Sequence, residues 1–227
     1  MEIIKFVREL KEGRVEGEIT KTIFVSLATS LIIFAVVYYF RLRSIEGFFD
    51  KYGFYLFFSF LSYAVIIPSV RQVRSFKEFP CMTGMMIGMT IGMISGFLSG
   101  FYIGATNGMF WGSVFGMSVG ILFGTWNGKC CGAMGFMEGI MAGFMGGLMG
   151  AMTAIMMFND NLKAAGVIVF AVCSVIIFGL NFMIYKETRE FERKHKDSTL
   201  FTIIWSFILT TATIWLMALG PRSVLLQ

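Results

Sequence analysis

The stretch GMMIGMTIGMISGFLSGFYIGATN, residues 84–107, carries a glycine at every fourth position, and this spacing continues without a miss to Gly132. After one phase shift, four more glycines resume the same spacing: Gly135, Gly139, Gly143 and Gly147. Small residues four apart let two helix backbones approach closely, which favours helix association in lipid. The pattern therefore predicts membrane helices packed through a glycine zipper.

The composition of the chain around this stretch is that of a membrane protein. Of 227 residues, 56% are hydrophobic and 15% are charged, and the mean hydropathy is +0.75. A soluble domain carries about 25% charged residues, so a water-soluble domain is excluded. Apolar runs long enough to cross ~30 Å of hydrocarbon recur along the chain. The sequence predicts an all-α integral membrane bundle of about seven transmembrane helices, with lipid as its surroundings.

The expected spans are separated by charged or turn-forming segments such as FNDN at 158–161. Spans three to five form the glycine-zipper core in this prediction, and Pro68 marks the end of span two. The spans lie at about 22–40, 54–70, 81–104, 108–124, 130–157, 162–185 and 198–219.

Three parts of the chain are expected to differ in their relation to the membrane. Residues 1–21 place apolar side chains on one side of a helix, as in an amphipathic helix lying in the membrane interface, although a helix packed on the protein is an equal alternative. Residues 22–220 form a single transmembrane domain with a Gly/Met-rich core at 81–157. Residues 221–227 form a short tail.

Lysine and arginine are distributed unevenly between the two sides of this seven-span topology. The side with the amino terminus holds 14 of them and the opposite side 5. Basic loops stay in the cytoplasm, so we expect a plasma-membrane protein with its amino terminus inside and its carboxyl terminus outside. The net charge of +5 thus reflects topology and does not indicate nucleic acid. A six-span topology would weaken the asymmetry.

The cysteines are expected to be reduced thiols. Cys130 and Cys131 are adjacent, and a disulfide between neighbours is strained. Cys173 stands alone in an apolar run and is expected in the core. The single histidine, His195, excludes a His-rich zinc or iron site. Any metal chemistry here would therefore use sulfur.

Methionine is concentrated where the glycines are: fifteen of the eighteen methionines lie between residues 82 and 157. At 100° per residue, those of span five fall within a sector of about 120°, and the glycines lie roughly opposite. The row covers about 33 Å, close to the hydrocarbon thickness. Cys130, Cys131 and Glu138 map onto or beside it. Its members are Met134, Met137, Met141, Met145, Met149, Met152 and Met156.

Span three adds a second group of methionines next to Cys81: Met82, Met85, Met86, Met89 and Met93. Thioether and thiolate sulfur are soft ligands that suit Cu(I) and Ag(I), and weak successive sites suit conduction. Thiolates bind such ions more tightly. Cys81, Cys130 and Cys131 are therefore candidates for a tight cytoplasmic end of a metal path. Cu(I), as ligand or substrate, is the only ion or cofactor the residues suggest.

Each of these residues also has a simpler interpretation. Methionine is flexible and fills irregular gaps beside glycine, so a single methionine is more often packing than ligand. Glu138, the one carboxylate inside the lattice, is a candidate for tuning the charge of the path or carrying a proton. The alternative is that Glu138 reaches the headgroups or pairs with Lys129.

The MxxxM steps beside GxxxG steps, as in Met137/Met141/Met145/Met149, resemble the membrane motifs of Ctr-type copper transporters. The segment from Cys81 to Met157 is also similar to Gly/Met-rich multi-pass membrane proteins of bacteria and archaea. Copper transport is what the first resemblance implies. Seven spans instead of three, and no Met-rich extracellular tail, depart from the Ctr pattern and put a trimeric pore in doubt.

The remaining functional classes have weaker support. GKCC at 128–131 lacks the glycine at 123 and the Ser or Thr at 130 that a phosphate loop requires. The spans hold no nucleophile, base and orienter triplet, so an enzyme is not expected. A metal-ion permease or channel is the leading hypothesis. The alternative is a structural subunit or assembly factor of a larger membrane complex, including a copper-delivery factor, whose glycine stripes dock other subunits or further copies of the chain.

Overall fold

The computed structural model describes residues 17–40, 52–74, 80–129, 132–188 and 199–220, and these parts are helical apart from short turns. Within these described ranges, seven helices are long and apolar enough to span a membrane, which confirms the predicted all-α membrane bundle. They are α2 (Gly17–Phe40), α3 (Phe54–Arg74), α4 (Cys81–Asn107), α5 (Met109–Gly128), α6 (Gly132–Met156), α7 (Leu162–Thr188) and α8 (Thr199–Leu219).

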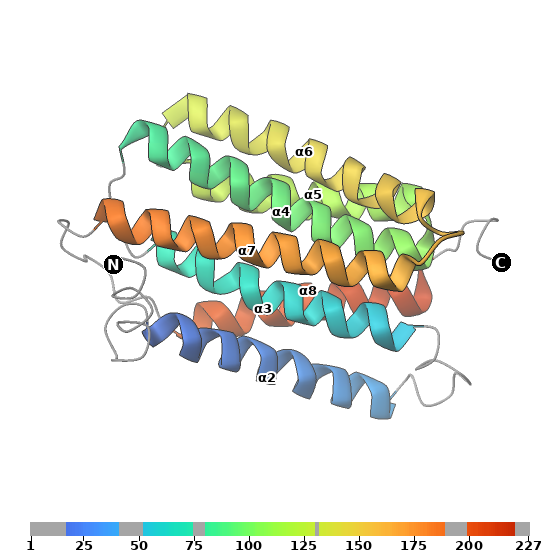
Figure 1. Cartoon of the computed structure of the whole chain (residues 1–227). Coiled ribbons are helices and arrows are strands. Elements are labelled where there is room, and N and C mark those ends of the chain that lie inside the picture. Colours follow the sequence, from blue (N-terminus) through green and yellow to red (C-terminus); the bar gives the residue numbers. More distant parts are fainter. Residues whose placement is uncertain (1–16, 41–51, 75–79, 130–131, 189–198, 221–227) are drawn as a thin grey trace.

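The helices are stacked across the bundle from α6 at one edge to α2 at the other (Figure 1). Next to α6 lie α4 and α5, then α7, α3 and α8. Helix α2 packs on α3 and α8 alone among the pairs in substantial contact. Helices α6 and α2 therefore lie at opposite edges of the bundle.

The closest packing is among α4, α5 and α6, where backbones approach at their glycines. A Cβ added at Gly120 of α5 would lie 2.8 Å from the Cα of Gly143 in α6 and 2.9 Å from the carbonyl oxygen of Gly92 in α4. A Cβ added at Gly92 would in turn lie 3.3 Å from the carbonyl oxygen of Gly139. No side chain larger than hydrogen fits at Gly120 without movement of the backbone. The three helices therefore form one tight unit.

A single residue, Gly108, separates α4 from α5. Its φ of 100° is in the left-handed region that favours glycine, and its N–H donates to the Gly104 carbonyl 3.1 Å away. The predicted break at residues 105–108 is therefore present, and it consists of Gly108 alone. Asn107 just before it is buried, and its Nδ2 donates to the Leu216 carbonyl of α8 at 2.6 Å.

Two predicted helix ends were wrong. Span two continues through Pro68 to Arg74, because a proline in a membrane helix is tolerated where neighbouring groups satisfy the freed backbone. Directly after Pro68, the Ser69 hydroxyl donates to the Val65 carbonyl at 3.3 Å. Span four continues to Gly128, so the segment predicted as a turn at 125–129 is mostly helix.

Several predictions concern residues outside those described. The interfacial helix at 1–21 falls there except for its last five residues, which belong to α2. Cys130, Cys131 and the tail at 221–227 also lie outside the described residues. The same holds for the basic segment at 189–198, which contains His195.

Candidate functional site: the methionine face

The methionines of α6 point away from the glycines and out of the bundle. The glycine side of α6 is buried against α4 and α5, from Gly135 to Gly150. The seven methionines on the other side are between 44% and 71% exposed: Met134, Met137, Met141, Met145, Met149, Met152 and Met156. The predicted separation of a glycine side from a sulfur side is thus present, with the sulfur side outermost.

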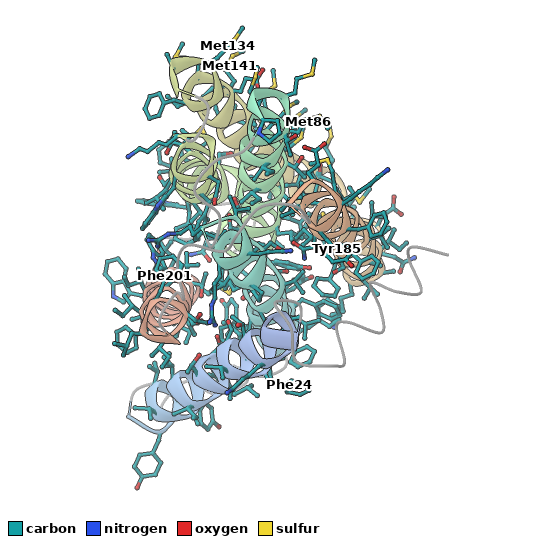
Figure 2. All side chains as sticks on the ribbon, turned by 90° about the vertical axis from the view of Figure 1, so that its left-hand side faces the viewer. Phe24, Met86, Met134, Met141, Tyr185 and Phe201 are labelled. Atoms are coloured by element: carbon teal, nitrogen blue, oxygen red, sulfur yellow. The ribbon has the colours of Figure 1, made fainter. Side chains whose placement is uncertain are left out.

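Helix α4 contributes a second exposed row, at Met82, Met86, Met89 and Met93. Met85 is half-buried. We call the two rows together the methionine face. Met86, Met134 and Met141 lie at the same outer end of the bundle in Figure 2, far from Phe24 of α2.

The two rows lie side by side because α4 and α6 run parallel. A Cβ at Gly146 would meet the backbone of Met93, and a Cβ at Gly150 would meet the backbone of Phe97. This register places Met93 next to the turn of α6 that carries Met145 and Met149. The methionine face is therefore continuous across the α4–α6 boundary and follows most of the length of α6.

An interior sulfur path within one chain does not match these positions. The interface between α4, α5 and α6 is filled by glycine backbone, and the sulfurs of α6 are on its outer side. Such outer positions meet lipid unless another protein covers them. The face can offer a passing ion ligands from one side only.

The other predicted ligands are partly described. Cys81 begins α4, and its thiol lies outside what the structure describes, as do Cys130 and Cys131. Glu138 is half-buried in the second turn of α6. Among the described residues, no three His, Cys, Asp or Glu side chains group as a metal site. Cys173 is buried in α7, as expected for a core residue.

One carboxylate that the sequence prediction passed over lies beside the start of α4. The Thr83 hydroxyl donates to Glu187 Oε2 at 2.6 Å, which ties the end of α7 to the first turn of α4. Glu187 is exposed, next to the end of the methionine face that begins at Met82. Only the antiparallel pairing of α4 with α7 brings it there, and the local sequence gives no sign of that pairing.

The other outward faces of the bundle use different side chains. On α7 and α8 the exposed apolar residues are valine, isoleucine, leucine, phenylalanine and tryptophan, as at Val175, Ile204 and Phe207. Exposed methionines among the described residues are confined to the segment from Met82 to Met157. The chain thus faces its surroundings with methionine on one side and with branched or aromatic side chains on the others.

The fold and this face define a class, a multi-pass α-helical membrane protein with a methionine-rich outer surface. Comparison with protein-family models, with curated proteins and with solved structures finds no match for the chain. What the methionine face does must therefore be inferred from its chemistry.

Proposed function

We propose that this protein is a membrane permease or channel for a soft monovalent ion, Cu(I) or Ag(I), which passes along the methionine face. The observation that carries the proposal is the contrast between the outward faces. Valine, isoleucine and phenylalanine cover the outside of α7 and α8, whereas α4 and α6 use mainly methionine there, beside Phe136 and Phe144 of α6. Any of these apolar side chains can contact lipid equally well. Contact with lipid therefore does not account for the use of methionine on α4 and α6. Coordination of a soft ion by thioether sulfur does.

A second copy of the chain completes the path in this proposal. An ion on the face of a single chain would have sulfur on one side and hydrocarbon on the other, which is costly for any charge. Two copies related by a two-fold axis present the same surface to each other. Pairing through Met141 and Met145, midway along α6, would surround the ion with thioethers from both copies.

The ends of the path follow from the remaining ligands. Cys81 begins α4, and in the sequence Cys130 and Cys131 directly precede α6; as thiolates these residues would bind the ion more tightly. Glu138, in the second turn of α6, would offset the charge of the ion. The lysine and arginine asymmetry supports a cytoplasmic position for this end, in a protein that we propose lies in the plasma membrane.

The exposure of the face favours one alternative. A flexible methionine surface also suits an adaptable docking site, so the chain could serve as a structural subunit, an assembly factor or a copper-delivery factor in a larger complex. Docking would then use the methionine face, because interface glycines of α4, α5 and α6 such as Gly96, Gly116 and Gly143 pack against backbone within the chain.

Silver uptake into proteoliposomes separates these functions. In the variant Met137→Leu/Met141→Leu/Met145→Leu, the side chains stay apolar and similar in volume, and three sulfurs are lost. We expect at least about a tenfold fall in Ag(I) flux and fewer bound Cu(I) ions per chain, since each ion loses ligands that leucine cannot replace.

The matched control changes three outward side chains of α7 in the same way, Val172→Leu/Val175→Leu/Ile176→Leu. This variant should transport silver like the unchanged protein. Equal flux and equal copper binding in the α6 variant would contradict the permease proposal. Normal folding with intact docking to other subunits would then favour the structural role.

A further inference from the structure

Basic side chains of α2, α3 and α5 gather at the end of the bundle where α3 and α5 stop and α2 and α8 begin. They are Lys21, Arg71, Arg74 and Lys129, and none of them is buried. Arg71 Nη1 donates to Thr22 Oγ1 of α2 at 2.7 Å, which brings the first three close together. The described side chains of α2, α3, α5 and α8 include no Asp or Glu. This part of the surface is therefore positive and complements an anion.

Arg74, the last residue of α3, lies between α5 and α8. Its guanidinium carbon is 5.2 Å from the ring centre of Trp126 in α5 and 4.4 Å from that of Phe201 in α8. The negative face of an aromatic ring attracts such a cation. The N–H donors of a guanidinium lie in its plane, in a fork that matches two oxygens of a phosphate. The two rings therefore orient a group suited to bind phosphate.

The rings around Arg74 form a cluster that joins α5 to α8. The ring centres of Trp126 and Trp205 are 5.1 Å apart, and those of Trp126 and Phe201 are 5.8 Å apart. All three rings are half-buried, so each keeps part of its surface facing outward. Tryptophan is enriched where lipid headgroups meet hydrocarbon. The position of the cluster, at the ends of helices that can span a membrane, matches that level.

The α7 side of the same end has a different charge. Lys186 there is followed by Glu187, an exposed carboxylate that accepts a hydrogen bond from Thr83. Figure 2 looks onto this end of the bundle and shows Phe201 of α8 and Tyr185 of α7 on different sides of it. The uncompensated positive charge of the described side chains therefore lies on the side of α8.

Outward apolar side chains continue from the ring cluster toward the middle of the bundle. Leu122 lies one turn before Trp126 and is 42% exposed, and Ile208 lies three residues after Trp205 and is 49% exposed. An anion with an apolar tail could contact both the basic end and these side chains. A soluble anion could use only the first.

We propose that this surface binds an anionic phospholipid, with the phosphate beside Arg74 and Lys129 and an acyl chain along Leu122 and Ile208. Lys129 is exposed and lies three residues after Trp126, so it can reach the same headgroup. Basic sites between membrane helices at the headgroup level are suited to acidic lipids. The binding does not depend on metal transport along the methionine face.

Native mass spectrometry of the full chain in a neutral detergent tests the proposal. The protein is titrated with phosphatidylglycerol or with phosphatidylcholine that carries the same acyl chains. We expect the first phosphatidylglycerol to bind at least about fivefold more tightly than phosphatidylcholine, since each basic residue near an anionic headgroup contributes about fivefold in affinity. The variant Arg74→Gln/Lys129→Gln should lose this preference.

The matched control, Lys163→Gln/Lys186→Gln, removes two exposed lysines of α7 and should keep the preference. Lys129→Gln alone leaves the ring contacts of Arg74 in place, so it should weaken phosphatidylglycerol binding without lowering the melting temperature. Equal binding of the two lipids by the unchanged chain would overturn the proposal. So would a preference that survives in Arg74→Gln/Lys129→Gln, or one that the α7 control loses to the same extent.

Discussion

Glycine at position 143 of α6 shows how a single residue sets the spacing of this bundle. A Cβ there would collide with the backbone between Gly120 and Ile121 of α5, where no flexible side chain can move aside. The same added carbon at Gly179 of α7 would meet nothing within 4 Å. The two glycines are chemically identical, and only the first is required by packing.

We therefore expect Gly143→Ala to destabilise the protein by about 2 kcal/mol or more, because backbone must shift to admit the methyl group. Gly179→Ala should be neutral or stabilising by up to about 1 kcal/mol, since alanine is the better helix former. Unfolding in mixed detergent micelles measures both. Equal stability of the two variants would be inconsistent with close backbone contact between α5 and α6.

The sequence predicted which residues share one side of a helix. It did not show whether that side faces the other helices or the surroundings of the bundle. The four-residue spacing of glycine and the sector of methionines in α6 followed from helix geometry alone. Whether Met141 points into the bundle or out of it depends on which helices cover α6, and local periodicity does not contain that information. Lipid and core are both apolar, so hydrophobicity could not decide it either.

Helices α2 and α8 are joined by hydrogen bonds between hydroxyl groups. The sequence contains the signal for their contact, because hydroxyl residues recur every fourth position in both helices, at Thr22, Ser26 and Ser30 and again at Thr202, Ser206 and Thr210. The sequence prediction used this spacing only for glycine. Ser and Thr are small enough for the same close approach, and they add hydrogen bonds between the helices.

A double-mutant cycle on Ser26→Ala and Ser206→Ala measures that bond. We expect a coupling energy of about 0.6 kcal/mol, the average for hydrogen bonds between membrane helices. The pair Ser26→Ala and Thr153→Ala should show none, because Thr153 bonds within α6. A coupling indistinguishable from this control would mean that the two hydroxyls do not interact.

The length and number of the helices were predictable, but some of their ends were not. Hydropathy gave seven spans, since each needs about 20 apolar residues. It could not show that α3 continues through Pro68 into RQVR, because that extension depends on tertiary support. There Arg74 lies over the rings of Trp126 and Phe201, from α5 and α8.

At the scale of the whole molecule, the bundle has two chemically distinct sides. The outer face of α4 and α6 presents thioether sulfur, and on the opposite side buried hydroxyl groups such as Ser26 and Ser206 lie between α2 and α8. The closely packed helices α4, α5 and α6 carry the methionine face on their outer side and separate it from the other helices.

If two copies meet through the methionine face, a cysteine in that face should cross-link to its counterpart. We expect Met145→Cys to form a covalent dimer in membranes with a short bifunctional thiol reagent, because a two-fold axis brings equivalent positions together. Val175→Cys, which is 71% exposed on α7, serves as the comparison. Equal dimer yields from the two positions would argue against pairing through α6.

X-ray absorption spectroscopy of the purified protein loaded with Cu(I) tests whether the ion binds along the methionine face. Coordination along the methionine face predicts a copper first shell made of sulfur, reduced in occupancy when Met137, Met141 and Met145 are replaced by leucine. A first shell of nitrogen or oxygen, or copper retention that the three replacements leave unchanged, would contradict it.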